Sequence, residues 1–156
     1  MTNDLKLIQI RRAKESDIPY IYSSWLEDYL SSHHTKLNQG KTKTLQSYVA
    51  LMPRDLYFKE QRAAIDKIIK KSKITIACNE DDEDQIFGYA VHRYVGDIDI
   101  LSWVYIRPVY RGFGICNLLM NNIGKSDVIT HLTPPRRWFL KKYDLIYNPF
   151  MEALDD

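Results

Sequence analysis

The sequence predicts an α+β fold, which some schemes group with α/β, in which a mixed but mainly antiparallel sheet is flanked by helices. Apolar runs of strand length follow one another through turns in the middle of the chain. Amphipathic helical patterns stand before and after them. A length of 156 residues with 45% hydrophobic content suits one core. We therefore expect a single domain over residues 1–156.

The first half of the chain predicts a strand and two helices. Residues 7–11 alternate as a strand does, and Ser16 and Asp17 are capping candidates just before Pro19. Apolar residues then fall on one helical face: Ile18, Ile21, Tyr22, Trp25, Leu26 and Tyr29. Residues 31–47 are polar and predict a loop. Residues 56–71 predict a second helix, whose terminal lysines complement its dipole.

The second half predicts the rest of the sheet. Strands are expected at residues 74–78, 86–94 and 98–106, with a solvated acidic hairpin turn at 79–85 and a turn at Gly96. Together with the first strand they form a four-strand antiparallel meander. A helix from Ile115 to Ile123 then leads to a fifth strand, residues 128–132, which a helical crossover allows to run parallel. A short helix at 136–142 and an extended segment at 145–150 follow.

The turn Arg111-Gly112-Phe113-Gly114-Ile115 carries the most specific chemical signal. Two glycines allow a tight turn and leave backbone N–H groups uncovered. The helix that follows begins with unpaired donors and a partial positive charge, to which Arg111 adds a full charge. This arrangement predicts a pyrophosphate bound at residues 112–116.

Other phosphate-binding motifs do not fit this turn. Neither Gly-Lys-Ser/Thr tripeptide of the chain follows a glycine at the P-loop spacing. A dinucleotide fingerprint needs three glycines after the first strand of a βαβ unit, whereas this turn has two and stands late in the chain. A turn whose glycines serve geometry alone remains the alternative.

The string from Val104 to Ile115 closely resembles the acetyl-CoA motif of the GNAT superfamily of acetyltransferases. Arg111, Gly112 and Gly114 match that motif, and Cys116 stands where the family has glycine or alanine. The segment Ile10-Arg-Arg-Ala-Lys-Glu-Ser-Asp-Ile-Pro resembles the family's first strand and helix start. The terminal Leu-Ile-Tyr-Asn-Pro-Phe and the short chain are also similar to small GNAT-like proteins encoded by bacteriophages.

The resemblance implies a GNAT-like fold, acetyl-CoA as acyl donor and a primary amine of a small molecule or protein as acceptor. It implies that the strand before the turn offers backbone groups to pantetheine and the turn binds phosphate. It also makes residues 31–47 a candidate substrate loop. The implied cofactor-binding residues are Val104, Tyr105, Ile106, Arg111, Gly112, Phe113, Gly114, Ile115, Cys116 and Thr133.

The acid and base depart from the family pattern. Where many members carry a glutamate on the central strand, this chain has Ile100 or Ser102, and Leu140 stands where the family has a tyrosine acid. A histidine titrates near neutral pH and is a reasonable base. The catalytic candidates are His131, Tyr143, Tyr147, Asp99 and Ser102. Two hypotheses stay open: an active N-acetyltransferase, and a GNAT-like binding or structural protein with weak or lost catalysis.

Charge and hydrophobicity argue against a nucleic-acid-binding, membrane-spanning or secreted protein. A net charge of +2 gives no strong nucleic-acid signal. The basic residues at 136–142 are expected to face solvent, although they could help to hold CoA phosphates. No apolar run approaches the roughly 20 residues of a membrane span, and the N-terminus lacks a signal-peptide core. We expect a cytoplasmic protein, in the host cytosol if it is phage-encoded, and a homodimer is possible.

The cysteines and histidines predict no metal site. Cys78 and Cys116 lack metal-type spacing and are expected to be reduced. Cys116 is better explained as a small residue in the glycine turn than as a nucleophile. The pair His33-His34 stands in a polar segment and is expected to be solvated.

Overall fold

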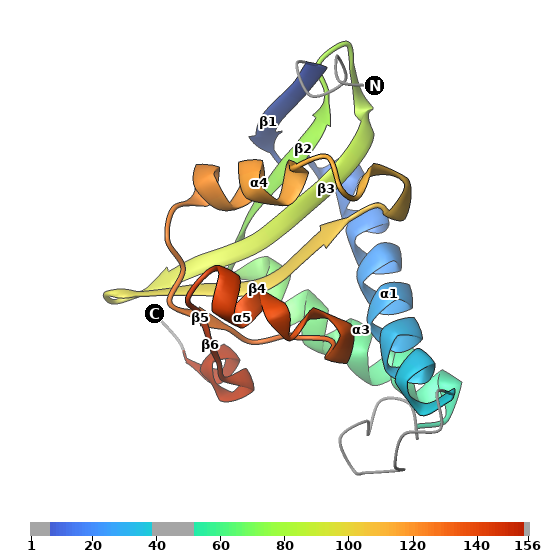
Figure 1. Ribbon diagram of the computed structural model, residues 1–156. Coiled ribbons are helices and arrows are strands. Elements are labelled where there is room, and N and C mark those ends of the chain that lie inside the picture. The colour runs from blue at the N-terminus through green and yellow to red at the C-terminus, as the bar shows by residue number, and fades with distance from the viewer. Residues whose placement is uncertain (1–6, 39–51, 155–156) are drawn as a thin grey trace.

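A six-stranded mixed sheet forms the centre of the computed structural model, which describes residues 7–38 and 52–154 (Figure 1). The strands follow one another in chain order across the sheet. The first four pair antiparallel, and the last two run parallel to the fourth. The strands are β1 (Ile8–Arg12), β2 (Lys73–Asn79), β3 (Asp82–Val95), β4 (Ile98–Ile106), β5 (Val128–Ile129) and β6 (Ile146–Tyr147). The expected mixed, mainly antiparallel sheet of an α+β fold is confirmed.

Helices cover both faces of the sheet (Figure 1). One hydrophobic cluster joins α1 and α3 to one face, and a second joins α4 and α5 to the other. The helices are α1 (Ile18–Asn38), α3 (Arg54–Lys70), α4 (Ile115–Ile123) and α5 (Trp138–Lys142). Short 3₁₀ helices are η2 (Glu15–Asp17), η4 (Pro108–Tyr110), η5 (Pro134–Arg136) and η6 (Pro149–Ala153).

The loop predicted at residues 31–47 is wrong in its first half. Residues 31–38 continue α1, and residues 39–47 lie outside the described part of the chain. No glycine or proline interrupts this segment before Gly40, so its polar side chains do not end the helix. Helix α1 therefore continues to Asn38, further along the chain than the sequence pattern indicated.

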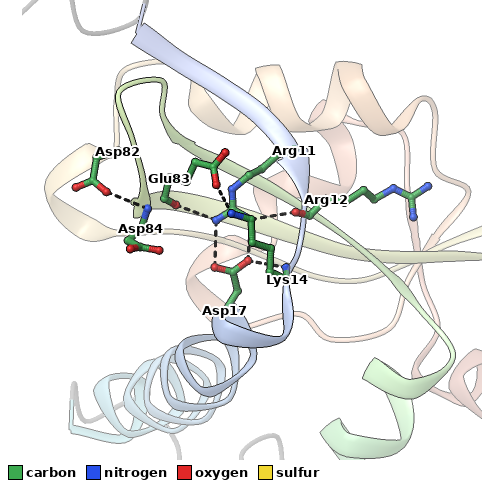
Figure 2. A network of polar contacts seen from close by, with 7 residues as sticks. All are labelled: Arg11, Arg12, Lys14, Asp17, Asp82, Glu83 and Asp84. Atoms are coloured by element: carbon green, nitrogen blue, oxygen red, sulfur yellow. Dashed lines mark hydrogen bonds and ion pairs between the residues drawn. The ribbon is translucent and has the colours of Figure 1, made fainter.

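The hairpin between β2 and β3 is also tighter than predicted. Only Glu80 and Asp81 form the turn, and β3 begins at Asp82. The acidic segment is not simply solvated, because the Arg11 guanidinium donates to the Glu83 carbonyl at 2.8 Å and Lys14 pairs with the Glu83 carboxylate (Figure 2).

Arg11 ties this hairpin to the start of the first helix (Figure 2). Its guanidinium donates to both carboxylate oxygens of Asp17, at 2.7 and 3.1 Å. The backbone N–H of Lys14 donates to the same carboxylate at 2.7 Å. Burial acts to raise the pKa of Asp17, but the bonds from Arg11 and Lys14 lower it on balance. The charged network thus joins β1, η2 and β3.

A bulge changes the register of β4 in its middle. Val91 pairs with Trp103 and His92 with Leu101, so Ser102 has no partner residue across the strand. Such an extra residue bends and twists a strand. Beyond it, Trp103 packs with the cluster of α1 and α3, whereas Val104 packs with that of α4 and α5.

Strand β5 is shorter than the predicted 128–132, although its parallel direction is confirmed. It pairs with β4 only through Ile100 with Val128 and Leu101 with Ile129. One further bond joins the Thr130 N–H to the Leu101 carbonyl at 3.1 Å. The chain then leaves β4 and continues into η5. Within the described part of the chain, β4 after the bulge therefore has no neighbouring strand on its β5 side.

Within residues 7–38 and 52–154, none of the helices has the length and apolar character needed to cross a membrane. Over the same residues, no group of three or more His, Cys, Asp or Glu side chains is close enough to hold a metal ion.

Candidate functional site

A pocket of about 690 Å³ opens where the end of β4 meets the glycine turn, α4, η5, α5 and the middle of α1. Most of the residues assigned to the cofactor from the sequence line it: Val104, Ile106, Arg111, Gly112, Gly114, Ile115 and Cys116. Tyr105, Phe113 and Thr133 lie outside its described lining. Side chains from distant segments complete the wall, among them Asp28, Arg136, Trp138 and Lys142.

The glycine turn presents bare backbone to this pocket. Gly112 and Gly114 have φ of 88° and 82°, in the left-handed region that favours glycine. A Cβ built on either would meet no atom within 4 Å, so the space above the turn is open. The first bond of α4 runs from the Leu118 N–H to the Gly114 carbonyl at 3.1 Å. The N–H groups of residues 115–117 therefore lack intrahelical acceptors and can bind an anion.

The outer edge of β4 forms the opposite wall. In an antiparallel pair, the backbone groups of alternate residues face the partner strand and those between them face away. The Arg107 N–H donates to Phe87 of β3 at 2.9 Å, and the Tyr105 carbonyl lies against Gly88 of the same strand. The backbone groups of Val104 and Ile106 consequently face away from β3, toward the pocket. Tyr105 differs from the expectation, since its backbone groups face β3.

Two arginines hold the carbonyls of this edge. Arg136 Nη1 donates to the Val104 carbonyl at 2.7 Å, and Arg111 Nε donates to the Ile106 carbonyl at 2.8 Å. Asp28 of α1 lies between them, 3.2 Å from Arg136 and 3.6 Å from Arg111. Burial lowers the pKa of Arg136, although Asp28 opposes this shift. Arg136 does not face solvent as expected, and it takes the place of a strand along β4.

The side of the pocket formed by α5 combines an aromatic ring with a cation. Trp138 is 56% exposed, and Lys142 Nζ lies 5.7 Å from the centre of its indole. Tyr143 donates a hydrogen bond to the Asn117 side chain and lies 3.8 Å from Cys116 Sγ. Burial raises the pKa of Cys116 and that of Tyr143, so both groups keep their protons at neutral pH. A protonated thiol is a poor nucleophile.

His131 lies on the α1 side of β4 and does not line the pocket. Its ring packs edge-on against Trp25 and Tyr29, with centroids 5.3 and 5.7 Å apart. Burial lowers the pKa of His131, although Glu152 opposes this, so the imidazole is neutral at pH 7. Tyr147 lies on β6 and is 42% exposed, and its partial burial raises its pKa.

Asp99 and Ser102 lie away from the glycine turn. At about 3.3 Å per residue, Asp99 near the start of β4 is roughly 20 Å from Ile106 at its end. Burial raises the pKa of Asp99 to about 6, with Asp127 adding to this and a hydrogen bond to Tyr94 opposing it. Ser102 is the unpaired residue of the bulge, and among described residues its buried hydroxyl has no partner. Asp99 and Ser102 therefore lie outside the described lining of the pocket.

Sequence reasoning missed three residues of this region: Asp28 and Arg136 as a pair, and Glu152 beside His131. The partners of Arg136 stand 32 and 108 positions away in the chain. The helical period that placed Tyr29 on the inner face of α1 also predicts its neighbour Asp28 close to the same face.

No family model matches the sequence, and no curated protein does. Among solved structures, 23 chains match. A GCN5-related N-acetyltransferase from Kribbella flavida is 18% identical with a TM-score of 0.47, over 76% of this chain and 64% of that one. A putative acetyl transferase from Pyrococcus furiosus is 13% identical with a TM-score of 0.48, over 86% and 91%.

PaiA N-acetyltransferase from Thermoplasma acidophilum, solved in complex with coenzyme A, is 15% identical with a TM-score of 0.43, over 74% of this chain and 69% of that one. Similarity to phage-encoded proteins stays a prediction. Because these identities are below 25% and the TM-scores below 0.5, what the pocket binds has to be inferred from its own residues. The structural neighbours of this chain are GNAT-family acetyltransferases, at low sequence identity.

Proposed function

We propose that the chain is an acetyl-CoA-dependent N-acetyltransferase, which moves an acetyl group to a primary amine of a small molecule or protein. One observation carries the proposal: the glycine turn at the start of α4 and the outward-facing edge of β4 line the same pocket. An anion cradle next to a row of backbone amides suits a ligand with a pyrophosphate and an amide-containing arm. Coenzyme A has both.

The residues present fit this ligand. The N–H groups of residues 115–117 and the charge of Arg111 would hold the pyrophosphate. Val104 and Ile106 would offer backbone groups to the pantetheine arm. The exposed face of Trp138 suits stacking against adenine, with Lys142 beside it. A volume of about 690 Å³ lies within the range of small-molecule sites.

The transfer needs a nucleophile, a base and an acid. The lone pair of the amine nitrogen forms a bond to the thioester carbonyl carbon, the carbon–sulfur bond breaks, and sulfur leaves with the electron pair. The amine loses a proton to a base, for which neutral His131 is suited. The leaving thiolate gains a proton, and Tyr143, next to Cys116 of the pocket wall, is one candidate donor. Tyr147 is a second.

The alternative is a protein of this fold that binds the cofactor and transfers acetyl groups weakly or not at all. The described lining of the pocket offers Asp28 as its carboxylate, and two arginines hold it. The Arg136 guanidinium also donates a hydrogen bond to the Val104 carbonyl. Positioning alone accelerates acyl transfer, so this arrangement lowers the rate without forbidding the reaction.

Calorimetric titration with acetyl-CoA and with CoA tests the binding, and mass spectrometry after incubation with a panel of amines and peptides tests the transfer. Binding with acetylation of an amine supports the enzyme and gives its acceptor class. Binding without transfer supports the alternative. If neither ligand binds, the glycine turn is only a turn and the proposal fails.

A further inference from the structure

A chain of hydrogen bonds behind the pocket ends on His131. The Thr130 hydroxyl donates to Glu152 Oε2 at 2.6 Å and lies 3.0 Å from His131 Nδ1. Glu152 Oε2 is itself 3.8 Å from the same ring nitrogen. Two side chains, Thr130 from the segment after β5 and Glu152 from η6, thus meet at one nitrogen of the imidazole.

The donors and acceptors of these three side chains determine which atom carries each proton. A carboxylate only accepts, so the single hydrogen of the Thr130 hydroxyl points to Glu152. The hydroxyl oxygen must then accept from His131 Nδ1, which therefore carries the ring proton. In a neutral imidazole the other nitrogen, Nε2, is left with a free lone pair.

A buried arginine, Arg93, lies on the far side of the Glu152 carboxylate from His131. Arg93 is 3% exposed, its Nε lies 3.8 Å from Glu152 Oε1, and its Nη2 donates to the Leu154 carbonyl at 2.7 Å. Lys71 donates to the Glu152 backbone carbonyl at 2.7 Å. Among described residues Arg93 Nε and Glu152 Oε1 have no hydrogen-bond partner, so Arg93 acts on the carboxylate through charge while its Nη2 and Lys71 fix the backbone of η6.

The imidazole is fixed from the other side by aromatic rings. Trp25 meets it edge-on at 5.3 Å, with an interplanar angle of 87°. Trp103 stacks on Trp25 at 5.4 Å, and the Arg136 guanidinium lies 5.3 Å from the Trp103 ring. Because Arg136 lines the pocket, ring contacts through Trp103 and Trp25 connect the pocket wall to His131 on the α1 side of β4.

We propose that Thr130 and Glu152 are positioning residues, which hold His131 with Nδ1 protonated so that Nε2 accepts the proton of the acceptor amine. The role as a base depends on the proposed acetyltransferase function, whereas the tautomer does not. Among the described residues, the ionisable groups that face the ring are Glu152 of η6 and Tyr29 of α1, with Arg93 of β3 behind the carboxylate.

Nitrogen-15 NMR of the imidazole side chains tests the tautomer without any activity measurement. In the unaltered chain we expect a proton on Nδ1 and none on Nε2 of His131. Thr130→Val removes the acceptor and should abolish this preference, whereas Thr130→Ser should keep it. Thr75→Val is the matched control, because Thr75 bonds His92 Nε2 at 2.9 Å with no carboxylate in that pair. A proton on Nε2 of His131 in the unaltered chain would overturn the proposal.

Kinetics on a confirmed acceptor test the catalytic consequence. Thr130→Val and Glu152→Gln should each lower kcat at least tenfold and alter the pH profile of kcat, with KM for acetyl-CoA within twofold. Thr130→Ser should restore kcat to within threefold, and Thr75→Val should leave it unchanged. Full kcat and an unaltered pH profile of kcat in both Thr130→Val and Glu152→Gln would refute the positioning role. Acetyl-CoA binding without transfer in the unaltered chain would instead refute the enzyme and leave the tautomer result standing.

Discussion

Arg136 and Val104 are joined by a 2.7 Å hydrogen bond from a guanidinium to a backbone carbonyl that faces away from β3. In a longer sheet a neighbouring strand would satisfy that carbonyl. Here β5 has already left, and a side chain from η5 supplies the donor. The same guanidinium pairs with Asp28 and lies over Trp103, so one residue links η5, α1 and β4.

Replacing Arg136 should therefore destabilise the fold. Arg136→Ala leaves the Val104 carbonyl and one side of Asp28 without a donor, and we expect a loss of about 2–4 kcal/mol in urea unfolding. The neighbouring exposed residue gives the control: Arg137→Ala should change stability by less than about 0.5 kcal/mol. Equal stability of the two variants would contradict this account of β4.

Replacing Gly112 should greatly weaken CoA binding and lower the stability of the fold only moderately. Gly112→Ala places a methyl group in the open space above the turn and strains a residue with φ of 88°. The strain should cost about 1–2 kcal/mol, and the CoA dissociation constant should rise at least tenfold. Gly112→Glu, which adds a negative charge, should abolish binding altogether.

Gly96 offers a matched control for the glycine turn. It has φ of 60° in the β3–β4 hairpin, and its Cβ position is also open. Gly96→Ala should carry similar strain but leave the CoA dissociation constant unchanged, as measured by calorimetry. Unaltered affinity in Gly112→Glu would remove the proposed site.

Gly88 should tolerate no side chain, for a different reason. A Cβ there would lie 2.5 Å from the Tyr105 carbonyl oxygen and 3.2 Å from Ile106 Cα, so backbone of β4 would have to move. We expect Gly88→Ala to cost about 2–3 kcal/mol in chemical denaturation. The reverse change in the same strand, Ala90→Gly, should cost only about 1 kcal/mol. A neutral Gly88→Ala would show that β3 and β4 separate more easily than their register implies.

Asp99 should make stability depend on pH in an unusual direction. Its pKa in the folded chain is raised to about 6 by burial, from an ordinary value of 3.8. Between these values the folded chain binds more protons than the unfolded chain, so the cost of the buried charge is fully present above pH 6 and disappears as pH falls toward 4. Asp99→Asn should therefore stabilise the protein at pH 7, on the order of 1 kcal/mol after solvent screening.

The comparison of Asp99→Asn with the unaltered chain at pH 7 and pH 4 measures this effect. The gain in unfolding free energy should be largest at pH 7 and close to zero at pH 4. Tyr94 and Asp127 face the carboxyl group and remain in both proteins. A gain that grows as the pH falls would mean that the pKa of Asp99 is not raised.

Local sequence patterns predicted much of the fold. Strand alternation, the glycine turn and the apolar spacing of α4 each act over a few residues, and the structure has all three where they were expected. Boundaries were wrong where a polar residue was taken as a break: residues 31–38 of α1 and 82–85 of β3 belong to regular elements. In both segments tertiary contacts or the absence of a breaker outweighed polarity.

The sequence predicted only the part of the candidate site that belongs to the glycine turn. Residues 111–116 carry their geometry in the glycines. The pairing of Asp28 with Arg136 spans 108 positions, and no local pattern reports it. At Thr130, where β5 has ended, the backbone N–H still bonds Leu101 of β4, whereas the side-chain hydroxyl donates to Glu152 of η6, a residue 22 positions later.

The unequal strands have a consequence for amide hydrogen exchange. Strands β2 and β3 are long and pair on both sides for much of their length, and β4 pairs along β3, whereas β5 and β6 are two residues each. Backbone amides should therefore exchange slowly in the first group and quickly in the second. The candidate site lies at the boundary between them. A ligand seated there would slow exchange on the fast side and leave the slow side almost unaltered.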